Sequence, residues 1–325
     1  MKKLLKIPFI FILSCTLFSC ATSIPMNVLR PAELDLGGAE YICVIPFRTS
    51  DYVFYPAVGN RLSITIGSSQ KVRNKAEKNI ADYITSGLVS KLSHSQYFKL
   101  VSATAVETAL RYGNKAPVDV YLTGNIDNFT NDIVTVKRKV EVDGKEVIKT
   151  YYSRKVGVSI SYQVVDASNN TIISYKNKNI GLESSENLKV NDLPDPIDLI
   201  DYQLDSLINQ ISNELQPYYV TITIKLLKDK TKNPKMKYAD ELANDGLIEE
   251  ARQTFMEVYL AIHQFEAGYN AAQLSVVLGD LEKAYSLMVE LVGDTQDKRA
   301  RTALRDIRNE INLAKKLKEQ QRARQ

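Results

Sequence analysis

Few side chains in this chain of 325 residues are suited to covalent or acid–base chemistry. Cysteine occurs three times, at Cys15, Cys20 and Cys43, and histidine twice, at His94 and His263. A thiol can act as a nucleophile or carry an acyl group, and an imidazole can transfer a proton or bind a metal. The surrounding residues decide which of these chemistries is supported, and Cys20 has the most informative surroundings.

The residues ahead of Cys20 have the layout of an export signal. Lys2, Lys3 and Lys6 carry positive charge before an apolar run at residues 7–13. That run is much shorter than the ~20 residues that a membrane-spanning helix needs. A charged start, a short apolar run and a small residue before the cut are typical of a secretory signal peptide. The sequence therefore predicts a signal at residues 1–19.

The signal ends in Leu17-Phe18-Ser19-Cys20, which resembles the lipobox of bacterial lipoproteins. The resemblance implies that Cys20 becomes the amino terminus and carries acyl chains such as palmitate. It also implies a periplasm-facing protein, and Ala21 in place of Asp after the cysteine fits sorting to the outer membrane. A plain secretory signal with an incidental cysteine and an uncut amino-terminal anchor are the alternative interpretations.

The rest of the sequence contains no pattern typical of catalysis or of a cofactor site. It lacks the glycine-rich phosphate loops, the G-x-S-x-G nucleophile elbow and the H-E-x-x-H zinc motif. Ser93 and Ser95 flank His94, but the sequence assigns no orienting carboxylate to them. Cys43 lies in an apolar run, which favours a small buried side chain. We therefore expect no enzyme activity, no cofactor and no metal site.

Charge is ordinary in amount but uneven along the chain. Charged residues make up 25% of the sequence, and loss of the signal lowers the formal net charge from +4 to +1. Residues 298–325 hold ten Lys and Arg against three acids, a net charge of +7. This basic end indicates either a solvated helix face or an anionic partner. A nearly neutral exported chain is not expected to bind nucleic acid.

Residues 39–227 alternate between strand and helix periodicity, as a small mixed α/β domain does. The apolar run Tyr41–Phe47 indicates a strand covered on both faces. The dipeptide Asp143-Gly144 predicts a tight hairpin turn within a β-meander. The predicted strands lie at 41–47, 97–101, 118–129, 133–142, 146–163, 171–180 and 219–227, and the predicted helices at 74–93, 103–112 and 197–215.

This element order resembles the curli-secretion lipoproteins (CsgG type), the penicillin-binding-protein activator lipoproteins (LpoB type) and the amino-terminal domain of TolB. The resemblance rests on a strand ending in Pro46-Phe47, a helix leading into Tyr97–Val101, and a strand–turn–strand pattern that includes Val165-Asp166. It implies a small α/β sandwich in a cell-envelope setting. For the curli type it also implies an oligomeric channel that inserts two hairpins per subunit into the outer membrane.

The chain departs from the channel pattern in its first hairpin. Lys137, Arg138 and Lys139 are consecutive, so charge falls on both faces of the strand. A basic side chain facing lipid near the bilayer midplane costs about 2–4 kcal/mol. We therefore expect this hairpin to stay in water.

The last third of the chain repeats itself at a fixed offset. Residues 239–255 align with residues 272–288, an offset just short of the period of the tetratricopeptide (TPR) repeat, and they resemble degenerate copies of that repeat. An amphipathic helix is predicted to follow at 297–318. The matched pairs are Ala239 with Ala272, Gly246 with Gly279, Ala251 with Ala284, and Phe255 with Met288.

These patterns predict an α+β protein with successive parts. The predicted parts are a signal at 1–19, a lipidated tether at 20–38, a CsgG-like α/β domain at 39–227, a linker at 228–237 and TPR-like helices at 238–325. The expected function is a lipid-anchored envelope adaptor or scaffold, and the alternative is an outer-membrane secretion channel. The expected partners are the membrane, through the lipid, and envelope proteins of unknown identity. Whether the chain also forms a homo-oligomer is left open.

Overall fold

The computed structural model describes residues 22–49, 52–55, 63–66 and 75–323. The chain forms two compact units. The α/β unit comprises Leu29–Tyr218 with Ala314–Gln325, and the helical unit comprises the chain up to Val28 with Tyr219–Leu313. The fold is α+β, as the sequence predicts. Among the described residues, no helix has the length and apolar character needed to cross a bilayer.

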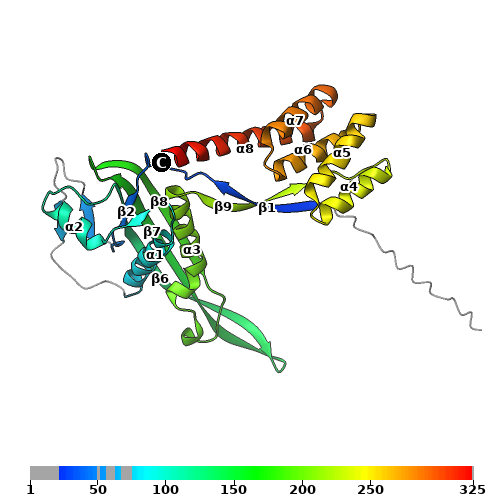
Figure 1. Ribbon diagram of the computed structural model, residues 1–325. Coiled ribbons are helices and arrows are strands. Elements are labelled where there is room, and N and C mark those ends of the chain that lie inside the picture. The colour runs from blue at the N-terminus through cyan, green and yellow to red at the C-terminus, as the bar shows by residue number, and fades with distance from the viewer. Residues whose placement is uncertain (1–21, 50–51, 56–62, 67–74, 324–325) are drawn as a thin grey trace, which may run out of the picture. The chain divides into compact units, whose positions relative to one another are not determined.

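The α/β unit contains a five-stranded mixed sheet in the order β5-β2-β6-β7-β8 (Figure 1). β2 (Tyr41–Val44) runs parallel to its neighbours β5 (Lys99–Leu100) and β6 (Val120–Val142). β6, β7 (Lys145–Asp166) and β8 (Thr171–Glu183) form an antiparallel meander. Asp143 and Gly144 join β6 to β7 with positive φ angles of 52° and 73°, which the predicted two-residue turn requires.

Helices cover both faces of the sheet at its buried end. α1 (Lys75–Ser93) and α3 (Pro196–Leu215) pack their apolar stripes on one face. α2 (Ala103–Arg111) covers Cys43 and Ile45 on the opposite face. β2 is therefore covered on both sides, which explains its continuous apolar run. Two shorter elements complete the described chain here: the β3–β4 hairpin (Tyr52–Tyr55 and Ser63–Ile66) and the 3-10 turn η1 (Val190–Asp192).

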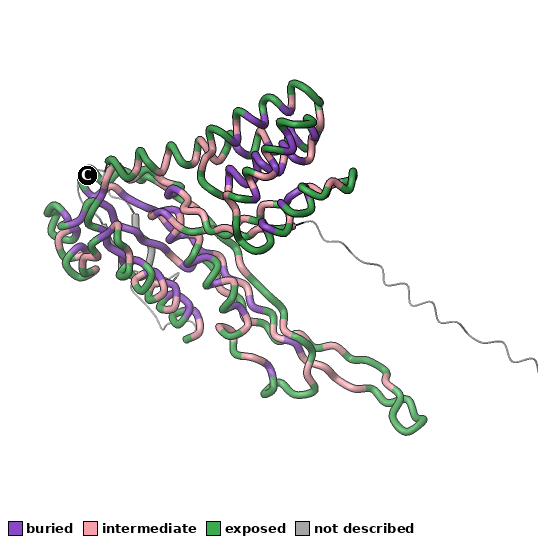
Figure 2. Tube along the Cα trace, turned by 45° about the vertical axis from the view of Figure 1, so that its right-hand side comes forward, coloured by how far each residue is buried: buried purple, intermediate pink, exposed green. Residues whose placement is uncertain are grey.

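β6 and β7 continue as a two-stranded hairpin beyond the end of β8. The last pairing of β8 joins Glu183 to Lys155, whereas β6 and β7 remain paired to Val142 and Lys145. We call residues 132–154 the hairpin arm. Its tip is exposed, in contrast to the buried strands at the other end of the sheet (Figure 2).

The helical unit repeats its backbone geometry at a constant spacing along the sequence. This spacing is the separation between Gly246 and Gly279, and we call it the repeat offset. These two glycines have φ angles of 80° and 81°, and His263 and Gln296, at the same spacing, have φ angles of 49° and 54°. The same side-chain positions are buried in successive copies. The predicted repetition is therefore present in three dimensions. The helices are α4 (Pro234–Asn244), α5 (Ile248–Ile262), α6 (Phe265–Val277), α7 (Leu281–Thr295) and the part of α8 (Lys298–Arg322) that ends at Leu313.

The amino-terminal segment differs from the tether expected at 20–38. It contains β1 (Ser23–Arg30), which pairs with β9 (Tyr218–Lys225) in a two-stranded ribbon (Figure 1). Ile24 of β1 and Ile224 of β9 pack on the core of the helical unit. β9 confirms the strand predicted at 219–227. It pairs with β1 and not with the five-stranded sheet of the predicted α/β domain, because the periodicity of a strand does not identify its partner.

The interval expected as a linker, 228–237, also has defined structure. α4 begins at Pro234, inside that interval, and Asn233 caps it by accepting a hydrogen bond from the amide of Lys235 at 3.0 Å. Asp229 accepts hydrogen bonds from Thr231 and Asn233 in the preceding turn. These local hydrogen bonds give defined structure to the interval that its polar composition indicated as an interdomain linker.

Candidate interaction surfaces

Cys20, the predicted acylation site, lies outside the described residues, and its lipidation stays a prediction. The structure does describe Thr22, two residues further along. The carbonyl oxygen of Thr22 accepts a hydrogen bond from the amide of Leu226 at 2.9 Å. Leu226 is buried in the core of the helical unit. Thr22 is therefore attached to that unit.

The other reactive side chains are not brought together. Cys43 is fully buried, and its burial, together with the nearby Glu107 carboxylate, raises the pKa of the thiol to about 12. His94 is exposed after α1, with Nδ1 2.7 Å from the carbonyl oxygen of Ser90. His263 is the left-handed cap of α5 in the other unit. Cys43 thus stays a neutral thiol near pH 7, as its interpretation as a packing residue predicts.

Close helix packing in the helical unit depends on small residues. A Cβ atom on Gly268 of α6 would lie 2.7 Å from a ring atom of Tyr259 on α5. The counterpart of Gly268 in α8, one repeat offset later, is Arg301, and the counterparts of buried Ala272 and Ser275 are Arg305 and Arg308. The three arginines are exposed. α8 thus presents charge where α6 is packed, which ends the repeat, because terminal copies need a polar outer face.

Two apolar side chains are exposed at the end of α5. Leu260 is 68% exposed and Ile262 is 60% exposed. Their counterparts in the next copy are Gly293 and Thr295. The repeat itself therefore does not require apolar residues at these positions. They are candidates for contact with another protein.

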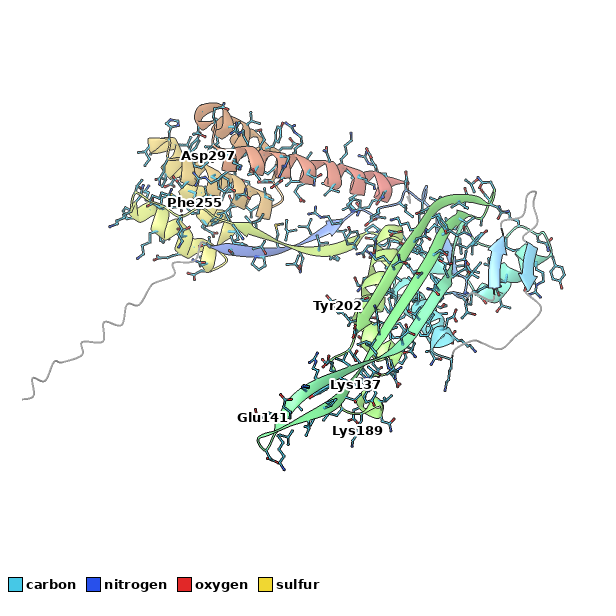
Figure 3. The ribbon with its side chains drawn as sticks, turned by 180° about the vertical axis from the view of Figure 1, so that it is seen from behind. Lys137, Glu141, Lys189, Tyr202, Phe255 and Asp297 are labelled. Atoms are coloured by element: carbon cyan, nitrogen blue, oxygen red, sulfur yellow. The ribbon has the colours of Figure 1, made fainter. Side chains whose placement is uncertain are left out.

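The hairpin arm places like charges opposite each other. Arg138 pairs with Lys149, and Glu141 pairs with Glu146, in the β6–β7 register. Direct like-charge pairs destabilise a sheet. A carboxylate from outside the hairpin offsets the repulsion between Arg138 and Lys149, because Glu186 lies 2.6 Å from the Arg138 guanidinium. Figure 3 shows Lys137 and Glu141 on this arm.

A cavity of about 620 Å³ lies at the amino-terminal ends of β2 and β6, and several carboxylates line it. Asp119 accepts hydrogen bonds from the amides of Glu40 and Tyr41, both at 2.9 Å. Asp166 accepts from the amide and hydroxyl of Ser168 at 2.8 and 2.7 Å. The Asp119 and Asp166 carboxylates therefore hold the local backbone at this cavity.

A basic surface that the sequence interpretation missed lies between β9 and α4. The segment Lys225–Lys237 holds six lysines and one acid, Asp229, which gives a net charge of +5. We call this segment the lysine loop. The signal in the sequence is the local excess of lysine over acid, whereas the linker predicted at 228–237 rests on polarity and Pro234.

Asp240, which follows the lysine loop in α4, is expected to make stability depend on pH. Burial, and then repulsion from Asp229, raises the pKa of Asp240 to about 6. In that pH range the folded chain binds more protons than the unfolded chain, so the free energy of unfolding falls as pH rises from about 4 through about 6. Asp240→Asn should therefore stabilise the helical unit by about 1–2 kcal/mol at pH 7.5 and leave it unchanged near pH 4. Chemical denaturation of both chains at the two pH values checks this, and equal gains at both would contradict it.

The comparisons with known proteins found similar chains among solved structures. No family model and no curated protein matches the sequence. A PelC dodecamer from Paraburkholderia phytofirmans is 13% identical, with 60% of this chain and 98% of that chain covered and a TM-score of 0.29. Lipoprotein GNA1162 from Neisseria meningitidis is 15% identical, with 54% and 99% covered and a TM-score of 0.27. Protein XCC0632 from Xanthomonas campestris is 10% identical, with 57% and 87% covered and a TM-score of 0.30. These values assign no family to this chain.

Proposed function

We propose that this protein is a lipid-anchored scaffold of the bacterial cell envelope that faces the periplasm from the outer membrane and holds a partner protein on its helical unit. The main observation that supports this proposal is the repetition of backbone geometry at the repeat offset across α4–α7. Stacked helical hairpins build extended surfaces for protein contact. The TPR-like identity of the repeats and the absence of catalysis are parts of this proposal.

The exposed end of α5 is the most specific part of the proposed contact surface. Leu260 and Ile262 leave apolar area in water at positions where the next copy of the repeat has Gly293 and Thr295. Since packing within the repeat does not explain them, contact with a partner does. An apolar centre surrounded by polar residues is the usual composition of such an interface.

In-cell photo-crosslinking tests the scaffold. A photoreactive residue at position 260 should give one discrete adduct with a second envelope protein. The matched control carries the same residue at Gly293, the repeat counterpart, where an added Cβ meets no atom within 4 Å. Equal adducts at both positions, or none at position 260, would count against the proposal. An adduct with a second copy of this chain would indicate that the surface forms a homo-oligomer and does not hold a partner protein.

One observation favours the alternative, an oligomeric secretion channel. The hairpin arm is long, and Val134, Val136, Val140 and Val142 lie on one of its faces. Arg138 interrupts the same face and lies opposite Lys149. Two adjacent basic groups facing lipid would cost about 4–8 kcal/mol at the midplane. In water there is no such cost, because the Arg138 head group reaches solvent and Glu186.

Cysteine labelling of the hairpin arm is expected to give aqueous signals at every position. Single cysteines at positions 134–140 would be labelled with a polarity-sensitive dye in native membranes. Native Cys43 remains in place, because its burial protects it, and the unaltered chain is the control for background. The same cysteines in a soluble, unacylated chain that begins at residue 20, carries Cys20→Ser and is kept free of membranes give the reference spectra. A lipid-exposed signal that alternates along the strand in membranes and vanishes in the soluble chain would restore the channel.

A further inference from the structure

The lysine loop presents an exposed positive surface on the helical unit. Lys225, Lys230 and Lys232 are exposed, and the ion pairs found within the described residues involve none of their ammonium groups. Lys235 and Lys237 pair with exposed Glu257 and Glu241 at 3.1 and 3.4 Å. Exposed pairs of this kind are weak. Most of the positive charge is therefore available to an outside anion.

Buried polar side chains fix the shape of this loop. The Asn270 side chain is fully buried; it accepts a hydrogen bond from the Leu227 amide at 2.7 Å and donates one to the Leu227 carbonyl oxygen at 2.8 Å. Gln264 donates to the Asp229 carboxylate at 2.7 Å. The lysines are thus carried by an ordered backbone, which lowers the entropy lost when they bind.

The backbone conformation at Lys232 is one in which glycine or asparagine would be more stable than lysine. Its φ angle is +60°, in the left-handed region where glycine and asparagine are preferred. The Lys232 side chain is exposed, so packing does not compensate for this preference. A positive charge at this position is better explained by binding than by folding.

The loop also lies close to the predicted lipid. Thr22 accepts a hydrogen bond from Leu226 at 2.9 Å, one residue after Lys225. Thr22 is two residues from Cys20, and two residues span at most about 8 Å. That reach is similar to the distance of about 8–10 Å over which salt screens surface charge. Acyl chains on Cys20 would therefore bring the start of the loop within electrostatic range of the membrane.

We propose that the lysine loop is a membrane-docking surface that binds the anionic headgroups of the lipid layer entered by the Cys20 acyl chains. This rests on the lipid anchor of the proposed function and adds a second attachment to it. A polybasic segment beside a lipid anchor binds anionic membranes through charge, and the two signals together hold a protein stably. The helical unit then lies against the membrane through the side that carries the lysine loop.

Vesicle binding by an unacylated chain tests the loop separately from the lipid. The chain begins at residue 20 and carries Cys20→Ser. It should bind phosphatidylcholine vesicles that contain roughly one-third phosphatidylglycerol, and it should not bind vesicles of pure phosphatidylcholine. Neutralising Lys225, Lys230 and Lys232 with glutamine should weaken binding by about 100-fold, because each lysine near an anionic surface contributes about fivefold. The matched control neutralises Lys137, Lys139 and Lys145 of the hairpin arm and should stay within about threefold of the parent.

Lys232→Gly separates binding from folding. It should reduce vesicle binding by about fivefold while the melting temperature stays the same or rises, because glycine suits the φ angle of +60°. A fall in melting temperature with unchanged vesicle binding would make the lysine structural and overturn the proposal.

Three other outcomes also overturn it. These are equal weakening by the two triple variants, equal binding to neutral vesicles, and full displacement from vesicles by millimolar inorganic phosphate, which would indicate a site for a small anion. Binding of an acidic protein by the loop, with no vesicle binding, would replace the membrane with that partner. Since the vesicle assay uses an unacylated chain, a missing lipid on native Cys20 would refute the anchor and leave the vesicle result interpretable.

Discussion

A chain carrying Cys20→Ala is expected to lose its acyl chains, so it should either move from the membrane fraction to the aqueous fraction or accumulate with its signal uncleaved. Each buried methylene of an acyl chain contributes about 0.8 kcal/mol to membrane binding. Loss of acylation should therefore lower the membrane partition coefficient by a factor on the order of a thousand or more.

Salt distinguishes the two attachments in this variant. Some of the Cys20→Ala chain should remain on membranes at low ionic strength through the lysine loop, and a high-salt wash should remove it. The unaltered chain should resist the same wash. Cys43→Ala is the matched control, because the Cys43 thiol is buried and cannot carry an exposed lipid. Mass spectrometry of the amino-terminal peptide supplies the direct readout, and a mature peptide without added mass in the unaltered chain would refute the lipid anchor.

Local patterns were enough to predict most elements of the α/β unit. The apolar run at Tyr41–Phe47 reflects a strand that has helices on both faces, and its burial follows from that position. Asp143-Gly144 specifies a turn through backbone angles that few other residue pairs adopt easily. The repeat offset predicted the helical hairpins because helix packing at Gly268 and the turns at Gly246 and Gly279 set strict local requirements. Each of these signals lies within a few residues of the structure that it specifies.

Features that depend on distant partners were not predictable. β1 and β9 are separated by almost the whole α/β unit in the sequence, and neither strand carries a mark of the other. The lysine loop is visible in the sequence as charge. Its relation to the amino terminus depends on the hydrogen bond between Thr22 and Leu226, which no periodicity reveals. The proposed membrane surface thus required both the composition and the fold.

A buried charge cluster in the α/β unit belongs to the same class of unpredictable features. The side chain of Glu214 on α3 is fully buried, and its Oε1 accepts a hydrogen bond from the Tyr162 hydroxyl at 2.9 Å. Lys176 of β8 places its Nζ 2.8 Å from the same oxygen and 3.5 Å from Glu33. Burial and the Glu214 carboxylate raise the pKa of Tyr162, so this side chain stays a neutral donor. The other carboxylate oxygen, Oε2, has no hydrogen-bond partner among the described residues.

Lys176→Met is expected to lower the free energy of unfolding of the α/β unit by about 2–4 kcal/mol at pH 7. Removing one member of a buried ion pair costs about 3–5 kcal/mol, and the partial exposure of Lys176 reduces that figure. Methionine keeps much of the volume of lysine, so the loss reports the charge rather than a cavity. Lys178→Met, on the same face of β8 but exposed, is the matched control and should change stability by less than about 0.5 kcal/mol. Urea denaturation of the three chains gives these differences.

The double variant Lys176→Met with Glu214→Gln decides whether charge is the cause. Glutamine accepts the Tyr162 hydrogen bond as the carboxylate does, but it leaves no buried negative charge without a cation. The double variant should therefore regain at least half of the stability that Lys176→Met loses. In the double-mutant cycle, which also needs Glu214→Gln alone, the coupling energy between Lys176 and Glu214 should exceed about 1 kcal/mol. Additive losses would instead show that Lys176 acts through packing of its apolar stem on β8. Recovery would show that the Lys176–Glu214 ion pair joins α3 and β8 at a fully buried position.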